Sequence, residues 1–122
     1  MAVTAADLHA RLLALSGAEL GYPFGPEVAV FKLRGKVFAM VAAADAGPRI
    51  TLKCDPVLAE ILREAHPAVR PGYHTDKRHW NTVHLEVGLD EAVLGDMIAS
   101  SYSLVRRALP KKVQVALNAG AA

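Results

Sequence analysis

The chain has 122 residues, of which 52% are hydrophobic and 21% charged, and its formal net charge at pH 7 is +2. This composition predicts one folded domain over residues 1–122 and excludes a disordered or a strongly basic protein. No secretory leader pattern and no run of about 20 apolar residues is present, so we expect a cytoplasmic protein without membrane contact. Cys54 is the only cysteine, which excludes an internal disulfide and a zinc site built from cysteines.

Hydrophobic periodicity and turn residues predict the secondary structure. Helices are indicated where apolar residues recur every three to four positions behind a capping residue, as they do after Thr4, Asp55 and Asp90. Strands are indicated where β-branched and aromatic residues lie between glycine and proline turns. The predicted order is a helix at 4–16, strands at 28–33, 36–44 and 49–53, a helix at 55–65, strands at 69–73 and 79–87, and a helix at 90–109, with a tail at 113–122 that is expected to fray. This order predicts a single compact α+β domain with a mainly antiparallel sheet.

The segment 67–82 concentrates basic, aromatic and turn-forming residues. It contains the only tryptophan, Trp80, and within or beside it lie four of the five histidines: His66, His74, His79 and His84. Its cations can neutralise phosphates and its rings can stack on bases, so the segment predicts a nucleic-acid contact surface. A structural interpretation stays open beside this one, in which Pro71 and Gly72 shape a tight loop, Trp80 covers the edge of the core, and Asn81 satisfies backbone groups.

Strand alternation extends this surface. It places Trp80 and His84 on the face opposite Val83, and it places Arg49 and Lys53 on the solvent side of their own strand. If both strands belong to one sheet, these side chains form a continuous basic and aromatic face. The alternative is that a terminal helix covers this face and the long side chains extend around it.

The sequence gives no support for catalysis or for a cofactor. The phosphate-loop, dinucleotide-binding, nucleophile-elbow and zinc-protease patterns are all missing, so we expect a protein that is not an enzyme. Successive histidines of the set His74, His79 and His84 are five positions apart, which puts the last two on opposite faces of a strand. No metal and no other cofactor is therefore expected.

Three blocks of the chain resemble the MmcQ/YjbR family of small bacterial proteins. They are Arg-Ile-Thr-Leu-Lys-Cys-Asp-Pro at 49–56, Pro-Gly-Tyr-His at 71–74 with Lys-Arg-His-Trp-Asn-Thr-Val at 77–83, and the closing segment 101–112; Tyr-Pro-Phe-Gly-Pro at 22–26 fits as well. The resemblance implies a compact α+β fold similar to type III secretion chaperones, and it implies DNA binding, which is the family's usual label. Asp76 departs from the family, in which an uncharged residue is more usual, and its carboxylate weakens the local positive field.

Residues and resemblance together predict a module that binds single- or double-stranded DNA through phosphate contacts. The predicted contact residues are Arg49, Lys53, Arg70, His74, Lys77, Arg78, His79, Trp80 and Asn81. Two alternatives stay open. One is a protein-binding, chaperone-like adaptor, and the other is a small-molecule-binding protein with a pocket of Tyr22, Phe24, Tyr73 and His74. The sequence predicts no oligomeric state.

Overall fold

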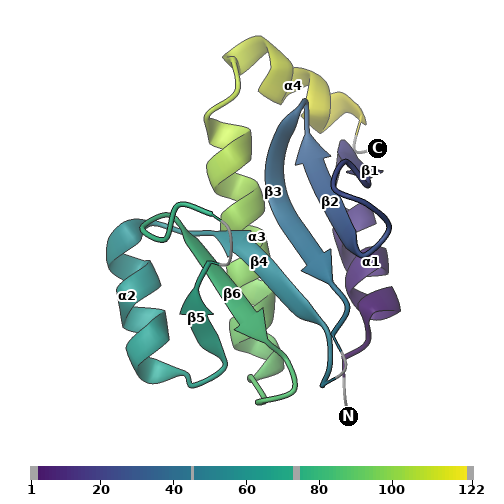
Figure 1. The fold of residues 1–122 in the computed structure, drawn as a ribbon. Helices are drawn as coiled ribbons and strands as arrows, with labels where there is room; N and C mark the ends of the chain where they lie inside the picture. The colour runs from purple at the N-terminus through teal and green to yellow at the C-terminus, as the bar shows by residue number, and fades with distance from the viewer. Residues whose placement is uncertain (1–2, 45, 73–74, 121–122) are drawn as a thin grey trace.

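Six strands form one sheet, and the helices cover only one of its faces (Figure 1). The computed structural model describes residues 3–44, 46–72 and 75–120. Its elements are α1 (Ala5–Leu13), β1 (Ala18–Gly21), β2 (Val28–Leu33), β3 (Lys36–Ala42), β4 (Arg49–Lys53), α2 (Pro56–Ala65), β5 (Val69–Pro71), β6 (Trp80–His84), α3 (Glu91–Arg107) and α4 (Lys111–Gly120). The strand order is β1-β2-β3-β4-β6-β5, and all neighbours are antiparallel. The predicted α+β class and antiparallel sheet are confirmed.

The predicted helix starts are those of the structure. Thr4 and Asp7 form a reciprocal capping box at the start of α1, in which each side chain accepts a hydrogen bond from the other residue's backbone amide. Asp55 accepts from two backbone amides at the start of α2, and Asp90 accepts from one at the start of α3. These carboxylates satisfy amides that have no partner inside the helix, which fixes where each helix begins.

The core lies between the sheet and the helices. Phe31, Ile50 and Val83 from the strands are buried there with Leu12 of α1 and Leu94 of α3. Helices α1 and α3 cover β1 to β4, and α2 covers β5 and β6. In Figure 1 the strands lie in front of α1 and α3, so the view is onto the helix-free face of the sheet.

A β-bulge between β2 and β3 leaves one backbone carbonyl without a partner in the sheet, and a side chain of α3 donates a hydrogen bond to it. Phe31 pairs with Ala39 and Lys32 pairs with Val37, so Phe38 is left out of the ladder. Its carbonyl accepts a hydrogen bond of 2.5 Å from the Ser101 hydroxyl. The same hydroxyl accepts a hydrogen bond of 2.8 Å from the backbone amide of Lys53, just where β4 ends. Ser101 therefore fastens α3 to two strands.

The variant Ser101→Ala is expected to lose about 1 to 2 kcal/mol of unfolding free energy, because a buried carbonyl and an amide lose their partner. Urea unfolding followed by circular dichroism measures the change. The half-buried Ser103→Ala, two positions along the same helix, serves as the control because its hydroxyl does not bridge two strands in this way. Equal stability of the two variants would contradict the bridging role of Ser101.

Two elements differ from the sequence-based expectation. The first helix ends at Leu13 instead of Ser16, and β1 follows it and pairs with β2. The tail at 113–122 was expected to fray, which is wrong for residues 113–120, because they belong to α4; residues 121–122 lie outside the described residues. Leu117 of α4 is buried against Gly17, where an added Cβ would lie 2.4 Å from the Leu117 side chain. The apolar contact holds α4 against the body of the domain.

Three strands end earlier in the structure than the sequence predicted, and one of them also begins a residue later. The strand predicted at 36–44 ends at Ala42, and the strand predicted at 79–87 covers only residues 80–84. The strand predicted at 69–73 ends at Pro71, and Tyr73 lies outside the described residues. Within the described part of the chain, none of the helices has the length and apolar character needed to cross a membrane.

Candidate nucleic-acid interface

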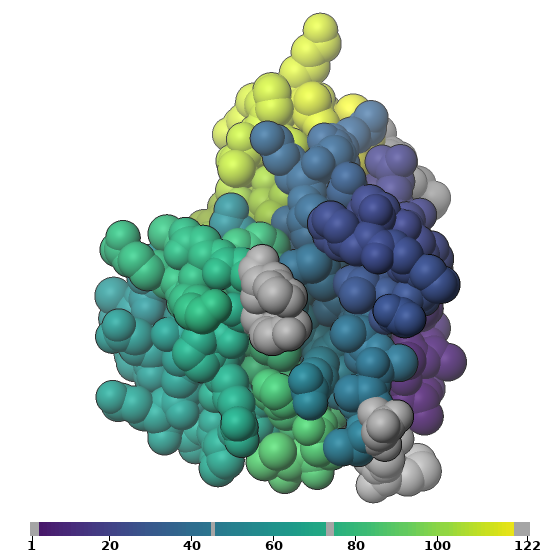
Figure 2. All heavy atoms as spheres, in the orientation of Figure 1, coloured from purple at the N-terminus to yellow at the C-terminus, as the bar shows by residue number. Residues whose placement is uncertain are grey.

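Strands β4 and β6 are neighbours, and their register brings the predicted basic and aromatic residues to one face. The paired residues are Arg49 with His84, Thr51 with Thr82, and Lys53 with Trp80. Ile50 and Val83, which alternate with them, belong to the core under the helices. Arg70 of β5 pairs with Thr82 and so lies on the same side. By strand parity the helix-free face, seen in Figure 2, therefore carries Arg49, Arg70 and Trp80, and Lys53 lies at its edge, where β4 ends and the space between α2 and α3 begins.

The middle of this face is closed to solvent. The hydroxyl oxygens of Thr51 and Thr82 lie 2.8 Å apart in a hydrogen bond across β4 and β6, and these side chains are only 8% and 2% exposed. The charged residues stand around this threonine pair. Because the pair links the two strands, it fixes the spacing of the cations on either side.

The pKa of His84 is affected by the positive charges on this face. Burial lowers the pKa of its imidazole below the ordinary value, and the guanidinium groups of Arg49 and Arg70 lower it further. The Glu86 carboxylate, 3.6 Å from His84 Nδ1, opposes this effect. His84 was not among the predicted contact residues, although its strand parity with Trp80 had indicated this face.

The loop 75–79 is organised by Asp76. Its carboxylate accepts a hydrogen bond of 3.0 Å from the Arg78 amide and lies 2.7 Å from His79 Nδ1. These hydrogen bonds, that of His79 first, lower the pKa of Asp76. The residue that departs from the family pattern therefore shapes the turn before β6, besides reducing the local positive charge.

Arg63 of α2 holds the same loop to the body of the domain. Its guanidinium donates to Asn81 Oδ1 at 2.6 Å, to the Trp80 carbonyl at 3.3 Å, and to the Lys77 carbonyl. The Lys77 amine in turn donates to the Gly72 carbonyl at 3.2 Å. Sequence reasoning missed Arg63, because nothing in the pattern of α2 showed that this arginine faces inward.

The predicted contact residues thus separate into groups. Lys77, Arg78 and His79 lie in the loop, and the first two border a hollow beside the start of α2 with Pro56 and Val57. These loop residues are separate from the basic and aromatic side chains on the helix-free face of the sheet. His74 lies outside the described residues.

Asn81 requires a correction. Its side chain is fully buried, accepts from Arg63, and donates to the Ala59 carbonyl at 3.3 Å. Because no part of it reaches solvent, the prediction that Asn81 contacts nucleic acid is wrong. Its partners show that it instead joins α2 to β6.

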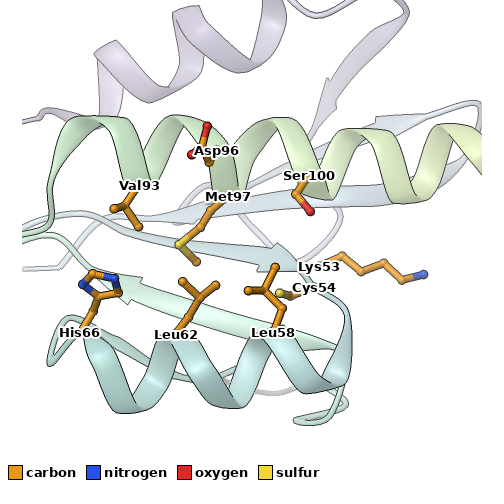
Figure 3. Close-up of a pocket in the computed structure, with 9 residues that line it drawn as sticks. All are labelled: Lys53, Cys54, Leu58, Leu62, His66, Val93, Asp96, Met97 and Ser100. Atoms are coloured by element: carbon orange, nitrogen blue, oxygen red, sulfur yellow. The ribbon is translucent and has the colours of Figure 1, made fainter.

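An apolar groove separates α2 from α3 on the other side of the sheet (Figure 3). Leu58 and Leu62 of α2 point toward Val93 and Met97 of α3, and the volume between them is about 280 Å³. Cys54 lies at its floor, and burial, followed by the charge of Asp55, raises the pKa of its thiol. A raised pKa disfavours the thiolate, and the buried Cys54 side chain packs as an apolar residue.

The helix-covered antiparallel sheet defines a small α+β domain of a known class. The YjbR family model matches residues 13–104. The uncharacterized protein YbdF of Escherichia coli O157:H7 is 39% identical over 108 residues, covering 88% of each chain. The uncharacterized protein YjbR of Escherichia coli strain K12 is 33% identical over 110 residues, which are 90% of this chain and 93% of that protein.

Solved structures agree with this assignment. The crystal structure of the Deinococcus radiodurans protein DR2400, a DUF419 domain, matches with a TM-score of 0.87 and 33% identity, over 94% of this chain and 88% of that chain. A Pseudomonas syringae protein matches with a TM-score of 0.75 and 25% identity, over 84% of this chain and 99% of that chain. The chain belongs to the YjbR family, which confirms the resemblance found in its sequence.

Proposed function

We propose that the protein binds nucleic acid through backbone phosphates, using the helix-free face of β4, β5 and β6. The observation that carries this proposal is the strand register, which gathers Arg49 and Arg70 on one face with Lys53 at its edge. No ion pair within the described part of the chain neutralises these three cations. Cations without partners on one surface attract a polyanion, and release of its counterions favours binding.

The geometry supports contact with the backbone more than sequence recognition. Phosphate contacts position a nucleic acid without reading its bases. The half-buried Trp80 beside Lys53 offers an aromatic edge on which a base or sugar can pack. We therefore propose a binding module of low sequence specificity that is not an enzyme, and we propose the cytoplasm as its compartment because nucleic acid is available there.

The test removes two cations of the face at once. The variant Lys53→Ala/Arg70→Ala is expected to bind DNA about tenfold more weakly at low salt. The plot of log affinity against log salt concentration should become shallower by about 1.4 to 1.8, the contribution of two phosphate contacts. Trp80 is the only tryptophan, so its fluorescence, together with the anisotropy of labelled single- and double-stranded DNA, measures binding.

The control removes the same charge elsewhere. Lys111 and Lys112 are exposed at the start of α4, outside the sheet, so Lys111→Ala/Lys112→Ala should bind almost as the wild type does. Equal losses in the two double variants would mean that only net charge matters. Absence of wild-type binding even at low salt would end the nucleic-acid proposal.

The groove between α2 and α3 favours a second candidate, a protein-binding adaptor. Besides the groove, α2 exposes Val57 and Ile61, which are 67% and 54% exposed. The volume of about 280 Å³ lies below the range of about 300–1,000 Å³ usual for small-molecule pockets, and it suits a few aliphatic side chains of an amphipathic helix. Binding of such a peptide would depend little on salt and would show a negative heat-capacity change, which separates it from phosphate binding.

A further inference from the structure

Arg49, Arg70 and His84 make a local concentration of positive charge on the helix-free face. His84 lies directly opposite Arg49, and Arg70 lies opposite Thr82, two positions before His84 on the same strand. Directly opposed side chains in an antiparallel pair begin about 5 Å apart and diagonal ones about 7 to 8 Å apart. Two guanidinium groups therefore flank the imidazole from the strands on either side of β6 and are long enough to reach one anion.

Arg49 lacks the counter-charge that a partly buried guanidinium needs. Its Nε is buried without a hydrogen-bond partner, and no carboxylate of the described residues forms an ion pair with it. An arginine held in this way normally has a carboxylate or phosphate beside it, because desolvated charge without a partner is costly. An anionic ligand would supply the missing charge. Both arginines lie close enough to His84 to lower the pKa of its imidazole, in addition to the larger effect of burial.

The positive charge of this cluster determines whether it suits a phosphodiester or a terminal phosphate monoester better. The two guanidinium groups carry two positive charges. The lowered pKa keeps His84 mostly neutral at pH 7, and a doubly charged anion beside it would favour the protonated imidazole, whose charge offsets that of Glu86. The Glu86 carboxylate faces His84 at 3.6 Å and is the acidic group of this cluster. A phosphodiester inside a strand carries one negative charge, whereas a terminal phosphate monoester carries about 1.5 to 2 at pH 7. It also presents more oxygens to planar guanidinium groups.

We infer that Arg49, Arg70 and His84 form a phosphate site on the helix-free face that prefers the terminal phosphate monoester of a nucleic-acid strand over an internal diester. This inference rests on the proposed nucleic-acid function. The proposed surface would contact internal phosphates along the strand, and this site would in addition bind the phosphate at the end of the strand.

The test compares oligonucleotides of one sequence that differ only at their ends. A 5′-phosphorylated, a 3′-phosphorylated and an unphosphorylated strand are titrated against the full chain at one salt concentration and pH 7. At least one phosphorylated strand should bind about tenfold more tightly than the unphosphorylated one. The variant Arg70→Gln, at an exposed position, should abolish the difference, and Arg49→Gln should do the same if it folds. Lys111→Ala/Lys112→Ala should preserve it.

Nuclear magnetic resonance locates the effect. Inorganic phosphate should shift the ring signals of His84 more than those of His9, which lies on α1. Equal affinity for all three strands would overturn the inference and leave the proposed function intact. Failure of every strand to bind would remove the proposed function and the inference together. A preference for phosphorylated ends that survives Arg70→Gln, with no shift at His84, would overturn the assignment of this site.

Discussion

Replacing Gly72 with alanine is expected to lower the free energy of unfolding by about 3 kcal/mol. Gly72 is buried where β5 ends, and its amide donates to the Trp80 carbonyl at 2.9 Å. An added Cβ would lie 2.1 Å from Thr75 Oγ1, 2.7 Å from Trp80 Cβ and 3.0 Å from the Trp80 carbonyl oxygen. The two atoms of Trp80 belong to β6 or adjoin its backbone, so they cannot move without disturbing the sheet. Urea unfolding measures the loss.

A second glycine provides the control. At Gly21, the last residue of β1, an added Cβ would meet only Pro23 Cδ, at 4.0 Å. The variant Gly21→Ala should therefore stay within about 0.5 kcal/mol of the wild type. Combining Gly72→Ala with Thr75→Ala removes the nearest clash but leaves Trp80, so only part of the stability should return. Wild-type stability of Gly72→Ala alone would show that the close approach of β5 and β6 is not required.

Local signals predicted most of the fold because they are short in range. Thr4, Asp55 and Asp90 cap helices through bonds to amides two or three residues away, and such bonds depend on the local sequence alone. Strand β1 was missed because its four residues, Ala18–Gly21, become a strand only by pairing with β2. Helix α4 was missed because Pro110 was interpreted only as the end of α3. Its carbonyl also accepts from Val113 and Gln114, so the same proline begins the next helix.

Strand parity was enough to predict which face of the sheet each candidate residue on β4 and β6 occupies. Parity placed Arg49, Lys53 and Trp80 on one side, and the register of β4 with β6 then brought them together. Parity also assigned Asn81 to the side of Val83, and this signal for its burial was available but was outweighed by its position next to Trp80. The inward direction of Arg63 was not predictable, because it depends on how α2 packs against β6.

The variant Asn81→Leu is expected to cost about 2 to 3 kcal/mol and to loosen the loop 75–79. Leucine has nearly the shape of asparagine, so the change removes hydrogen bonds without opening a cavity. The Arg63 guanidinium loses its acceptor at 2.6 Å, and the buried Ala59 carbonyl loses its donor. Since Arg63 also holds the Lys77 carbonyl, the loop should open more often, and trypsin should cleave after Lys77 or Arg78 faster than in the wild type.

Asn118 provides a matched control because it makes the same kind of bond in an exposed place. Its Oδ1 accepts from the Arg106 guanidinium at the surface of α4, where water can replace either partner. The variant Asn118→Leu should therefore change stability by less than about 0.5 kcal/mol and leave cleavage in the loop 75–79 unaffected. Similar losses for the two variants would mean that burial does not set the strength of the bond between Arg63 and Asn81. Faster cleavage in Asn81→Leu alone would show that the buried bond between Arg63 and Asn81 keeps the loop 75–79 closed.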